Sequence, residues 1–242
     1  MAIHADADMG GPAEIGHTHA DVSGGWLRAS VFGAMDGLVT NISLVAGVGA
    51  AGAPPRTVVL TGMAGLVAGA FSMALGEYMS VSTQAEQVDH EVDVERREIL
   101  EHPKAEQAEL AVMFQELGMR AETAAAAAAD VHGDPERATW VHVTQELGID
   151  PDDTPSPRVA AVSSFVTFSL GAVIPLIPYL LGFDSLAAAL VVGACGLLGA
   201  GALAAMFTVQ PWWRNALRQL AFGAVAATAT YVVGMLIGVN VT

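Results

Sequence analysis

The sequence has little charge and almost no cysteine. Of its 242 residues only 14% are charged and 10 are basic, while 53% are hydrophobic. A chain of this length with so few charges is typical of membrane proteins rather than of an ordinary soluble domain. Its single cysteine, Cys195, excludes an internal disulfide, and we expect its thiol to pack among apolar neighbours.

Several signatures of catalysis are missing as well. The chain has no glycine-rich phosphate loop with its lysine, no nucleophile elbow and no cysteine-rich metal cluster. Nothing in the sequence therefore indicates an enzyme or an ATP-driven pump. Transport of a solute, if it occurs, would take its energy from an ion gradient.

The first 25 residues lack both a basic n-region and an apolar h-region, so they do not read as a secretory signal. We interpret them as a disordered cytoplasmic tail. Its three histidines, His4, His17 and His19, are interpreted as incidental, with weak metal binding as the alternative.

Five apolar windows are each about 20 residues long or more, which is the length a membrane-spanning helix needs. They cover residues 29–51, 57–79, 159–183, 185–209 and 219–242. The predicted fold is an all-α membrane protein with five transmembrane helices. If the N-terminus is cytoplasmic, nine of the ten basic residues fall on that side and only Arg56 outside, and the C-terminus is then external.

The acidic residues gather in one segment. Residues 86–153 hold 18 of the 25 Asp and Glu residues and five basic ones, hence 13 of the 15 net negative charges. Such a block repels nucleic acid and attracts cations. We therefore predict a cytoplasmic acidic helical domain over 85–156, inserted between transmembrane helices 1–2 (26–84) and transmembrane helices 3–5 (157–242).

Prolines and glycines predict where the helices begin and end. No proline interrupts residues 57–102, so the second span is expected to continue out of the membrane as one helix that ends before Pro103. The last helix of the acidic domain is expected to start at Asp134 as N-cap and to end at Gly148. In the third span, Pro175 and its neighbour Pro178 predict a kink or an end.

Carboxylates recur at helical spacing on the acidic helices, with few basic partners. Oxygen ligands joined by an imidazole or a thioether suit Fe²⁺ or Mn²⁺, with Zn²⁺ also compatible. The alternative is that these residues form solvated faces of surface helices. The candidate metal ligands are Glu95, Glu98, Glu106, Glu109, Met113, His142 and Glu146.

A carboxylate interrupts the first span. Asp36 lies within "FGAMDGLVTNISLVAGVGA", where burial in lipid would cost about 2.5 kcal/mol or more. The polar residues that follow it, Asn41 among them, favour the wall of a translocation pathway; a hydrogen bond to a neighbouring helix is the alternative. The second span adds Met73, a soft exchangeable ligand, and Glu77, with packing and an interfacial position as the respective alternatives.

The stretches "DGLVTNISLVAGV" and "SMALGEYMS", together with the acidic insertion, make the chain resemble the vacuolar iron transporter family over nearly its whole length. The resemblance implies a five-span homodimer that exchanges Fe²⁺ for protons, with Asp36 and Met73 in the pore. It also implies a cytoplasmic metal-binding domain. Its first two helices carry four glutamates spaced by three, eight and three, matched here by Glu95, Glu98, Glu106 and Glu109, and Glu146 matches the glutamate of the last helix.

The chain departs from the family pattern at three places. Where related sequences have a pair of methionines before the last glutamate, this chain has His142 and Val143, so sulfur is replaced by imidazole or lost. Some related sequences have an acidic residue in the second span where this chain has Gly65, and another at the cytoplasmic end of the first span where this chain has Ala29. These departures make the preference for iron over Mn²⁺ or Zn²⁺ an open point and shift the expected proton path toward Asp36 and Glu77.

The expected function is a proton-coupled divalent metal transporter that exports Fe²⁺ or Mn²⁺ from the cytoplasm, with the lipid bilayer, metal ions and protons as partners. The low cysteine count fits a bacterial inner membrane. A membrane-anchored metal buffer or sensor is the alternative, although a buffer has no need of Asp36. A ferritin-like oxidase would need Glu-x-x-His pairs, which the acidic domain lacks.

Overall fold

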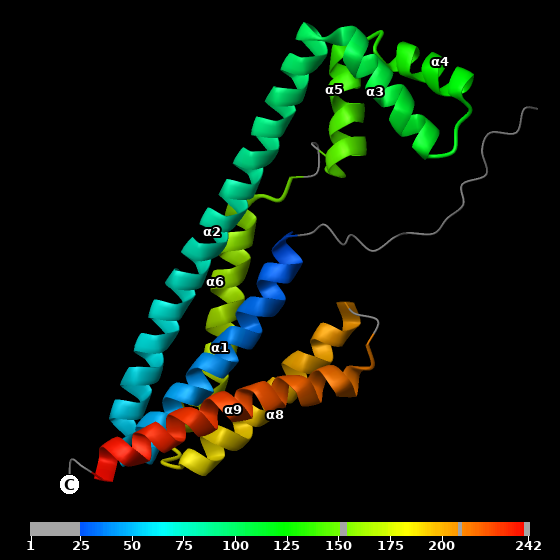
Figure 1. The fold of residues 1–242 in the computed structure, drawn as a ribbon. Coiled ribbons are helices and arrows are strands. Elements are labelled where there is room, and N and C mark those ends of the chain that lie inside the picture. Colours follow the sequence, from blue (N-terminus) through cyan, green and yellow to red (C-terminus); the bar gives the residue numbers. More distant parts are fainter. Residues whose placement is uncertain (1–24, 151–153, 208–209, 240–242) are drawn as a thin grey trace, which may run out of the picture.

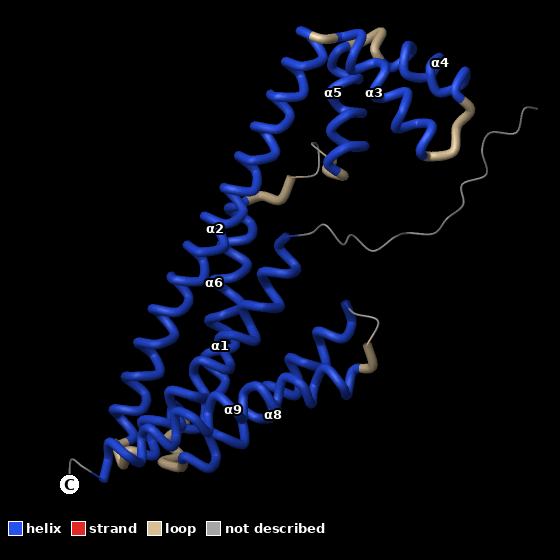
Figure 2. The backbone as a smooth tube through the Cα atoms, in the orientation of Figure 1, coloured by secondary structure: helices blue, strands red, loops and turns tan. Residues whose placement is uncertain are grey.

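The computed structural model describes residues 25–150, 154–207 and 210–239, and every regular element among them is a helix (Figure 1). The predicted N-terminal tail with its three histidines lies outside these residues, apart from Gly25. The helices are α1 (Gly25–Ala50), α2 (Pro55–Glu101), α3 (Pro103–Glu116), α4 (Ala121–Val131), α5 (Pro135–His142), the π-turn η1 (Val143–Leu147), α6 (Pro157–Val173), the 3₁₀ turn η2 (Ile174–Leu176), α7 (Ile177–Leu180), α8 (Leu186–Ala204), the 3₁₀ turn η3 (Ala205–Phe207) and α9 (Trp212–Val239). Short loops join them (Figure 2).

Five of the described helical stretches are long and apolar enough to cross a membrane, which confirms the predicted fold class. They are α1, the apolar part of α2, α6 continued by α7, α8 and α9. Large apolar side chains remain exposed on their outer faces, for example Phe222, Val225 and Leu236 on α9. A water-soluble domain does not leave so much apolar surface uncovered, whereas lipid covers it without cost.

Helix α1 lies at the centre of the bundle, in contact with α2, α6, α8 and α9. Its closest neighbour is α6. At Gly37 a Cβ atom would collide with the carbonyl oxygen of Phe168, so only glycine permits this approach. One turn further along α1, the buried Asn41 donates its side-chain amide to the carbonyl of Ala172 at 2.5 Å, which ties the two helices together.

Helix α2 is one uninterrupted helix of 47 residues. Its one proline, Pro55, is its first residue, so nothing breaks the backbone ladder between the apolar half and the acidic half. It turns at His102, and Pro103 then occupies the first position of α3. The prediction of a single helix that ends before Pro103 is therefore confirmed, and α3, α4 and α5 lie at the far end of α2 from the five-helix bundle (Figure 1).

The third apolar stretch is broken where its prolines predict. Helix α6 ends at Val173, a 3₁₀ turn carries Pro175, and the four-residue α7 carries Pro178. Because proline lacks an amide hydrogen and crowds the preceding turn, the regular ladder cannot pass through this segment. The interruption lets Leu176 enter a buried cluster with Val45 of α1.

Candidate metal centre

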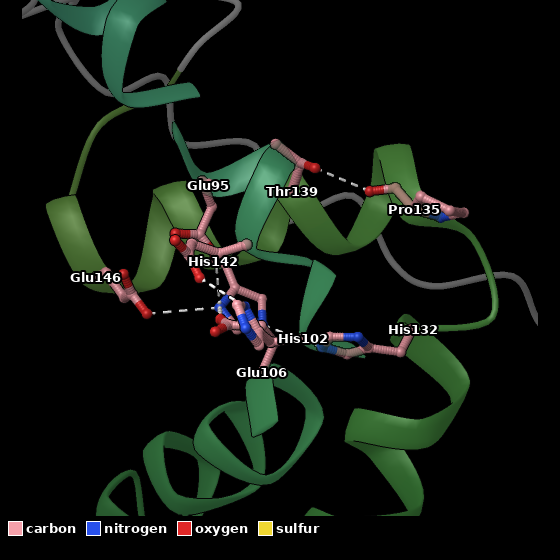
Figure 3. Close-up of polar contacts among 9 residues, drawn as sticks. Glu95, His102, Glu106, His132, Pro135, Thr139, His142 and Glu146 are labelled. Atoms are coloured by element: carbon pink, nitrogen blue, oxygen red, sulfur yellow. Dashed lines mark hydrogen bonds and ion pairs between the residues drawn. The ribbon is translucent and has the colours of Figure 1, made fainter. Parts of the chain in front are cut away.

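Four polar side chains from four different elements converge at the far end of α2 (Figure 3). The ring of His142, at the end of α5, lies in the middle and is completely buried. Its Nδ1 atom is 3.1 Å from Glu95 Oε1, 3.5 Å from Glu146 Oε1 and 3.8 Å from Glu106 Oε2. We call Glu95, Glu106, His142 and Glu146 the metal cluster.

Local sequence brings these side chains together. The unbroken α2 carries Glu95 away from the membrane, and the turn at Pro103 directs Glu106 of α3 back toward it. Asp134 caps α5 by accepting the amide hydrogen of Glu136 at 3.0 Å, as the sequence predicts. The cap and the proline at the first helical position fix the start of the helix on which His142 lies.

Directly after His142, the helix that begins as α5 changes from α-helical to π-helical geometry. Residues Val143–Leu147 form a π-turn, and Gly148 ends it in the left-handed region with φ 63°. A π-turn is wider than an α-turn and occurs often at functional sites. Glu146 follows His142 by four residues and stays on the same side of the helix through this turn, with 3.5 Å between their nearest polar atoms.

Burial and mutual repulsion perturb the carboxyl groups of the metal cluster. Desolvation, followed by the negative charges of Glu146, Glu106, Glu109 and Glu98, raises the pKa of Glu95 to about 7. The pKa of Glu106 is also raised, again mainly by desolvation and then by Glu109, while His142 opposes the shift. Without a cation, Glu95 is therefore about half protonated near neutral pH.

Two atoms of the metal cluster lack the partners that buried polar atoms normally have. Among the described residues, neither Glu95 Oε1 nor His142 Nδ1 has a hydrogen-bond partner, although only 3.1 Å separates them. Their orientations do not suit a hydrogen bond to each other. A buried unsatisfied polar group is costly, so such a pair fits a site that a cation can occupy.

The donor atoms fit a divalent cation. One ligand atom each from Glu95, His142 and Glu146 lie within 4.8 Å of one another. Carboxylate oxygens with one imidazole nitrogen suit Fe²⁺, Mn²⁺ or Zn²⁺, whereas Cu⁺ prefers sulfur. The arrangement can capture such an ion by exchanging a proton for it.

The remaining predicted ligands lie at the edge of the metal cluster or apart from it. Glu98 is half exposed and Oε2 of its carboxylate is 3.0 Å from Nδ1 of His102. Glu109 is exposed. The negative charges of Glu98 and Glu109 both contribute to the raised pKa of Glu95. Met113 is half-buried on α3. Direct ligation by these three residues stays a prediction.

His132 contacts the metal cluster but is not among the predicted ligands. Nε2 of His132, at the turn between α4 and α5, lies 3.1 Å from Nε2 of His142. Desolvation and the neighbouring His142 lower the pKa of His132, so its ring is neutral near pH 7. The signal in the sequence was a pair of histidines ten residues apart, the first of which opens the tight "HGDP" turn and the second of which ends the short helix after it.

Each residue predicted for the translocation pathway has its own contacts within the single chain. The carboxylate of Asp36 is exposed on α1 and accepts a hydrogen bond from Thr40 at 3.5 Å. Met73 packs against a buried cluster that contains Phe168. Glu77 pairs with Arg28 at 3.4 Å. Asn41 is fully buried and bonded to α6, as described above. A shared pathway stays a prediction.

Comparison with known proteins supports metal transport. Residues 27–235 match the VIT family. A vacuolar iron transporter of Acanthamoeba castellanii is 34% identical over 232 residues, which cover 93% of this chain and 84% of that protein. Vacuolar iron transporter homolog 1 of Oryza sativa subsp. japonica is 34% identical over 220 residues, covering 89% and 75%. Vacuolar iron transporter 1 of Arabidopsis thaliana is 28% identical over 228 residues, covering 91% and 90%.

These relatives are named as transporters and not as enzymes, in agreement with the missing catalytic signatures. The match extends over all five apolar helices and the acidic helices between the second and the third. The chain is therefore a member of the VIT family, a family of integral membrane metal transporters.

Proposed function

We propose that the protein is a homodimeric, proton-coupled transporter that captures Fe²⁺, or Mn²⁺, at the metal cluster and exports it from the cytoplasm. The observation that carries the proposal is the buried pair of unpartnered atoms, Glu95 Oε1 and His142 Nδ1, at the end of a helix continuous with the second span. Relatives named iron transporters support iron as the cargo.

Passage through the membrane is assigned to Asp36 and Met73. A carboxylate exposed on the outside of a transmembrane helix is costly in lipid. A second copy of the chain packed against α1 would cover Asp36 and place two such carboxylates around one path, which supports the homodimer. Asp36 would bind either a proton or the metal, and this competition would couple the two fluxes.

The direction of transport follows from the orientation. The metal cluster and nine of the ten basic residues lie on the side we assign to the cytoplasm, so the cluster would collect the ion there. The acidic helices would then form a cytoplasmic metal-binding domain. We keep a bacterial inner membrane as the proposed location, and fractionation of the native cells tests it against the vacuolar location in the names of the relatives.

The test is Fe²⁺ flux into proteoliposomes under an imposed pH gradient, with a pH dye inside. Wild-type protein should admit metal and release protons together. Asp36→Asn keeps the size of the side chain and its ability to accept from Thr40 but removes the charge, and we expect it to reduce both fluxes at least tenfold. Equal flux in a correctly inserted Asp36→Asn protein would refute the pathway assignment.

The same assay separates transport from buffering. A membrane-anchored buffer or sensor would bind metal through the metal cluster and move none in either protein. Gly76→Ala is a matched control, because no atom outside its own helix lies within 4 Å of the added methyl group. Its flux should equal that of the wild type.

A further inference from the structure

The turn between α4 and α5 holds His132 in a fixed place beside the metal cluster. The amide of His132, the C-cap residue of α4, donates to the Ala128 carbonyl at 3.0 Å, as in the preceding helical turn. Two residues later Asp134 caps α5, and the amide of Asp134 itself donates to the Val131 carbonyl at 3.3 Å. The C-terminal end of α4 and the N-terminal end of α5 thus fix the backbone on the two sides of His132.

The two histidine rings meet head-on. Their Nε2 atoms are 3.1 Å apart and the ring centroids 5.2 Å apart, with the planes at 84°. The centroid separation is nearly the nitrogen separation plus the two ring radii, so each Nε2 points along the line to the other. This is the geometry of an N–H···N hydrogen bond, in which one ring donates and the other accepts. Figure 3 draws this contact.

The direction of that hydrogen bond decides what the other face of His142 can do. A neutral imidazole carries one hydrogen, on Nδ1 or on Nε2. If His142 donates from Nε2, its Nδ1 has a free lone pair that faces the three carboxylates of the metal cluster. If it accepts at Nε2, its Nδ1 carries the hydrogen and cannot bind a cation.

We propose that His132 is a positioning residue that accepts the Nε2 hydrogen of His142 and so fixes His142 as a metal ligand through Nδ1. The inference deepens the proposed capture function and rests on it. Histidine ligands commonly donate their second ring nitrogen to a partner that fixes the tautomer and the ring orientation. Here the partner is a second histidine, half-buried in the turn between α4 and α5, and it reaches the buried ring of His142 from outside α5.

Because His142 is completely buried, no solvent molecule replaces this partner directly. Removing the acceptor therefore leaves the Nε2 hydrogen of His142 without a partner, and the ring gains by shifting its hydrogen to Nδ1, where the negative charges of three carboxylates attract it. That shift removes the nitrogen ligand. Loss of a supporting residue of this kind weakens metal binding about 10- to 100-fold.

The test uses the full-length protein in detergent, with Mn²⁺ as the probe. The EPR signal of free Mn²⁺ gives the affinity and the number of ions bound, and electron spin-echo modulation from ¹⁴N reports whether a nitrogen is coordinated. Wild-type protein should bind one Mn²⁺ at the metal cluster with a directly coordinated nitrogen.

Two substitutions separate shape from hydrogen bonding. His132→Phe keeps a ring but has no acceptor, and it should weaken Mn²⁺ binding about 10- to 100-fold and abolish the ¹⁴N modulation. His132→Gln offers an amide oxygen as acceptor and should retain the modulation and an affinity within about threefold of the wild type. His132→Leu is the second variant, for the case in which the phenyl ring does not fit. It also lacks an acceptor, so we expect the same loss of Mn²⁺ affinity and of ¹⁴N modulation. His90→Phe, at an exposed position on α2, is the control and should change neither readout.

Three results would overturn the positioning role. The first is unchanged affinity and modulation in His132→Phe and His132→Leu. The second is weaker binding with the modulation intact, which would mean that His132 only supports the fold. The third is two ions in the wild type and one in the variants, which would make His132 a ligand itself. His142→Phe and Glu95→Gln test the proposed capture function separately from the role of His132. If these two variants also bind Mn²⁺ like the wild type, the metal cluster is not the capture site.

Discussion

Replacing Glu95 by glutamine removes a charge from the metal cluster and keeps the shape of the side chain. In the wild type the pKa of this carboxyl group is about 7 because burial and four neighbouring carboxylates disfavour its ionised form. A metal binds the ionised form, so protons compete with it. Glu95 is about nine-tenths ionised at pH 8 and about one-tenth at pH 6.

The magnitude follows from those fractions. Between pH 8 and pH 6 the apparent affinity for Mn²⁺ should fall about tenfold through this one group. A carboxyl group with the ordinary pKa of 4.5 would change it by only a few per cent over the same range. In Glu95→Gln the affinity at pH 8 should be about 10- to 100-fold weaker, as expected for a charged contact worth about 1.5–3 kcal/mol.

The assay is an EPR titration of free Mn²⁺ with full-length protein in detergent at both pH values. The decisive quantity is the ratio of the two affinities, which should be about tenfold smaller for Glu95→Gln than for the wild type. Glu91→Gln, one turn earlier on α2 and exposed, is the matched control and should keep the wild-type ratio. The same ratio in wild type and Glu95→Gln would refute the assignment of the raised pKa and of the proton exchange to Glu95.

Two further predictions concern stability. The folded protein holds the proton of Glu95 more tightly than the unfolded chain, so the metal-free protein should lose stability as pH rises from about 4.5 to about 7, and its melting temperature in detergent should fall over that window. The fall should shrink in Glu95→Gln and on adding Mn²⁺, and a melting temperature that rises with pH would contradict it. Gly37→Ala forces a methyl group onto the carbonyl of Phe168 and should destabilise the bundle by about 1–3 kcal/mol. Gly76→Ala, with open space around it, should melt like the wild type, and equal melting of both variants would argue against the close packing of α1 and α6.

Much of the fold could be predicted because it depends on local sequence. Hydropathy alone locates the five spans, since lipid demands a continuous apolar surface. The absence of proline between residue 57 and residue 102 predicts the length of α2, and the Asp134–Pro135 pair predicts the start of α5. Spacing on helix faces likewise indicates Glu95 and Glu106 as residues of one site.

The parts that could not be predicted depend on packing between distant elements. Burial of His142 requires α2, α3 and α5 to close around it, and its contact with His132 requires the turn after α4 to fold back beside that ring. The π-turn that carries Glu146 has no sequence rule of its own. The sequence likewise gives no sign that the amide of Asn41 donates to the carbonyl of Ala172 on α6, a contact between residues 131 positions apart.

The continuity of α2 has a mechanical consequence. Met73 and Glu95 are 22 residues apart, so at about 1.5 Å per residue they are about 33 Å apart along one stiff rod, and at 3.6 residues per turn they lie within about 40° of the same face. A tilt of this rod by about 5° at its membrane end would move Glu95 by about 3 Å. Helix α5, which carries His142, packs against α2 and would move with it, so the rod acts as a lever for the whole metal cluster. A small rocking of the second span would therefore shift the metal cluster as one unit relative to the other membrane helices.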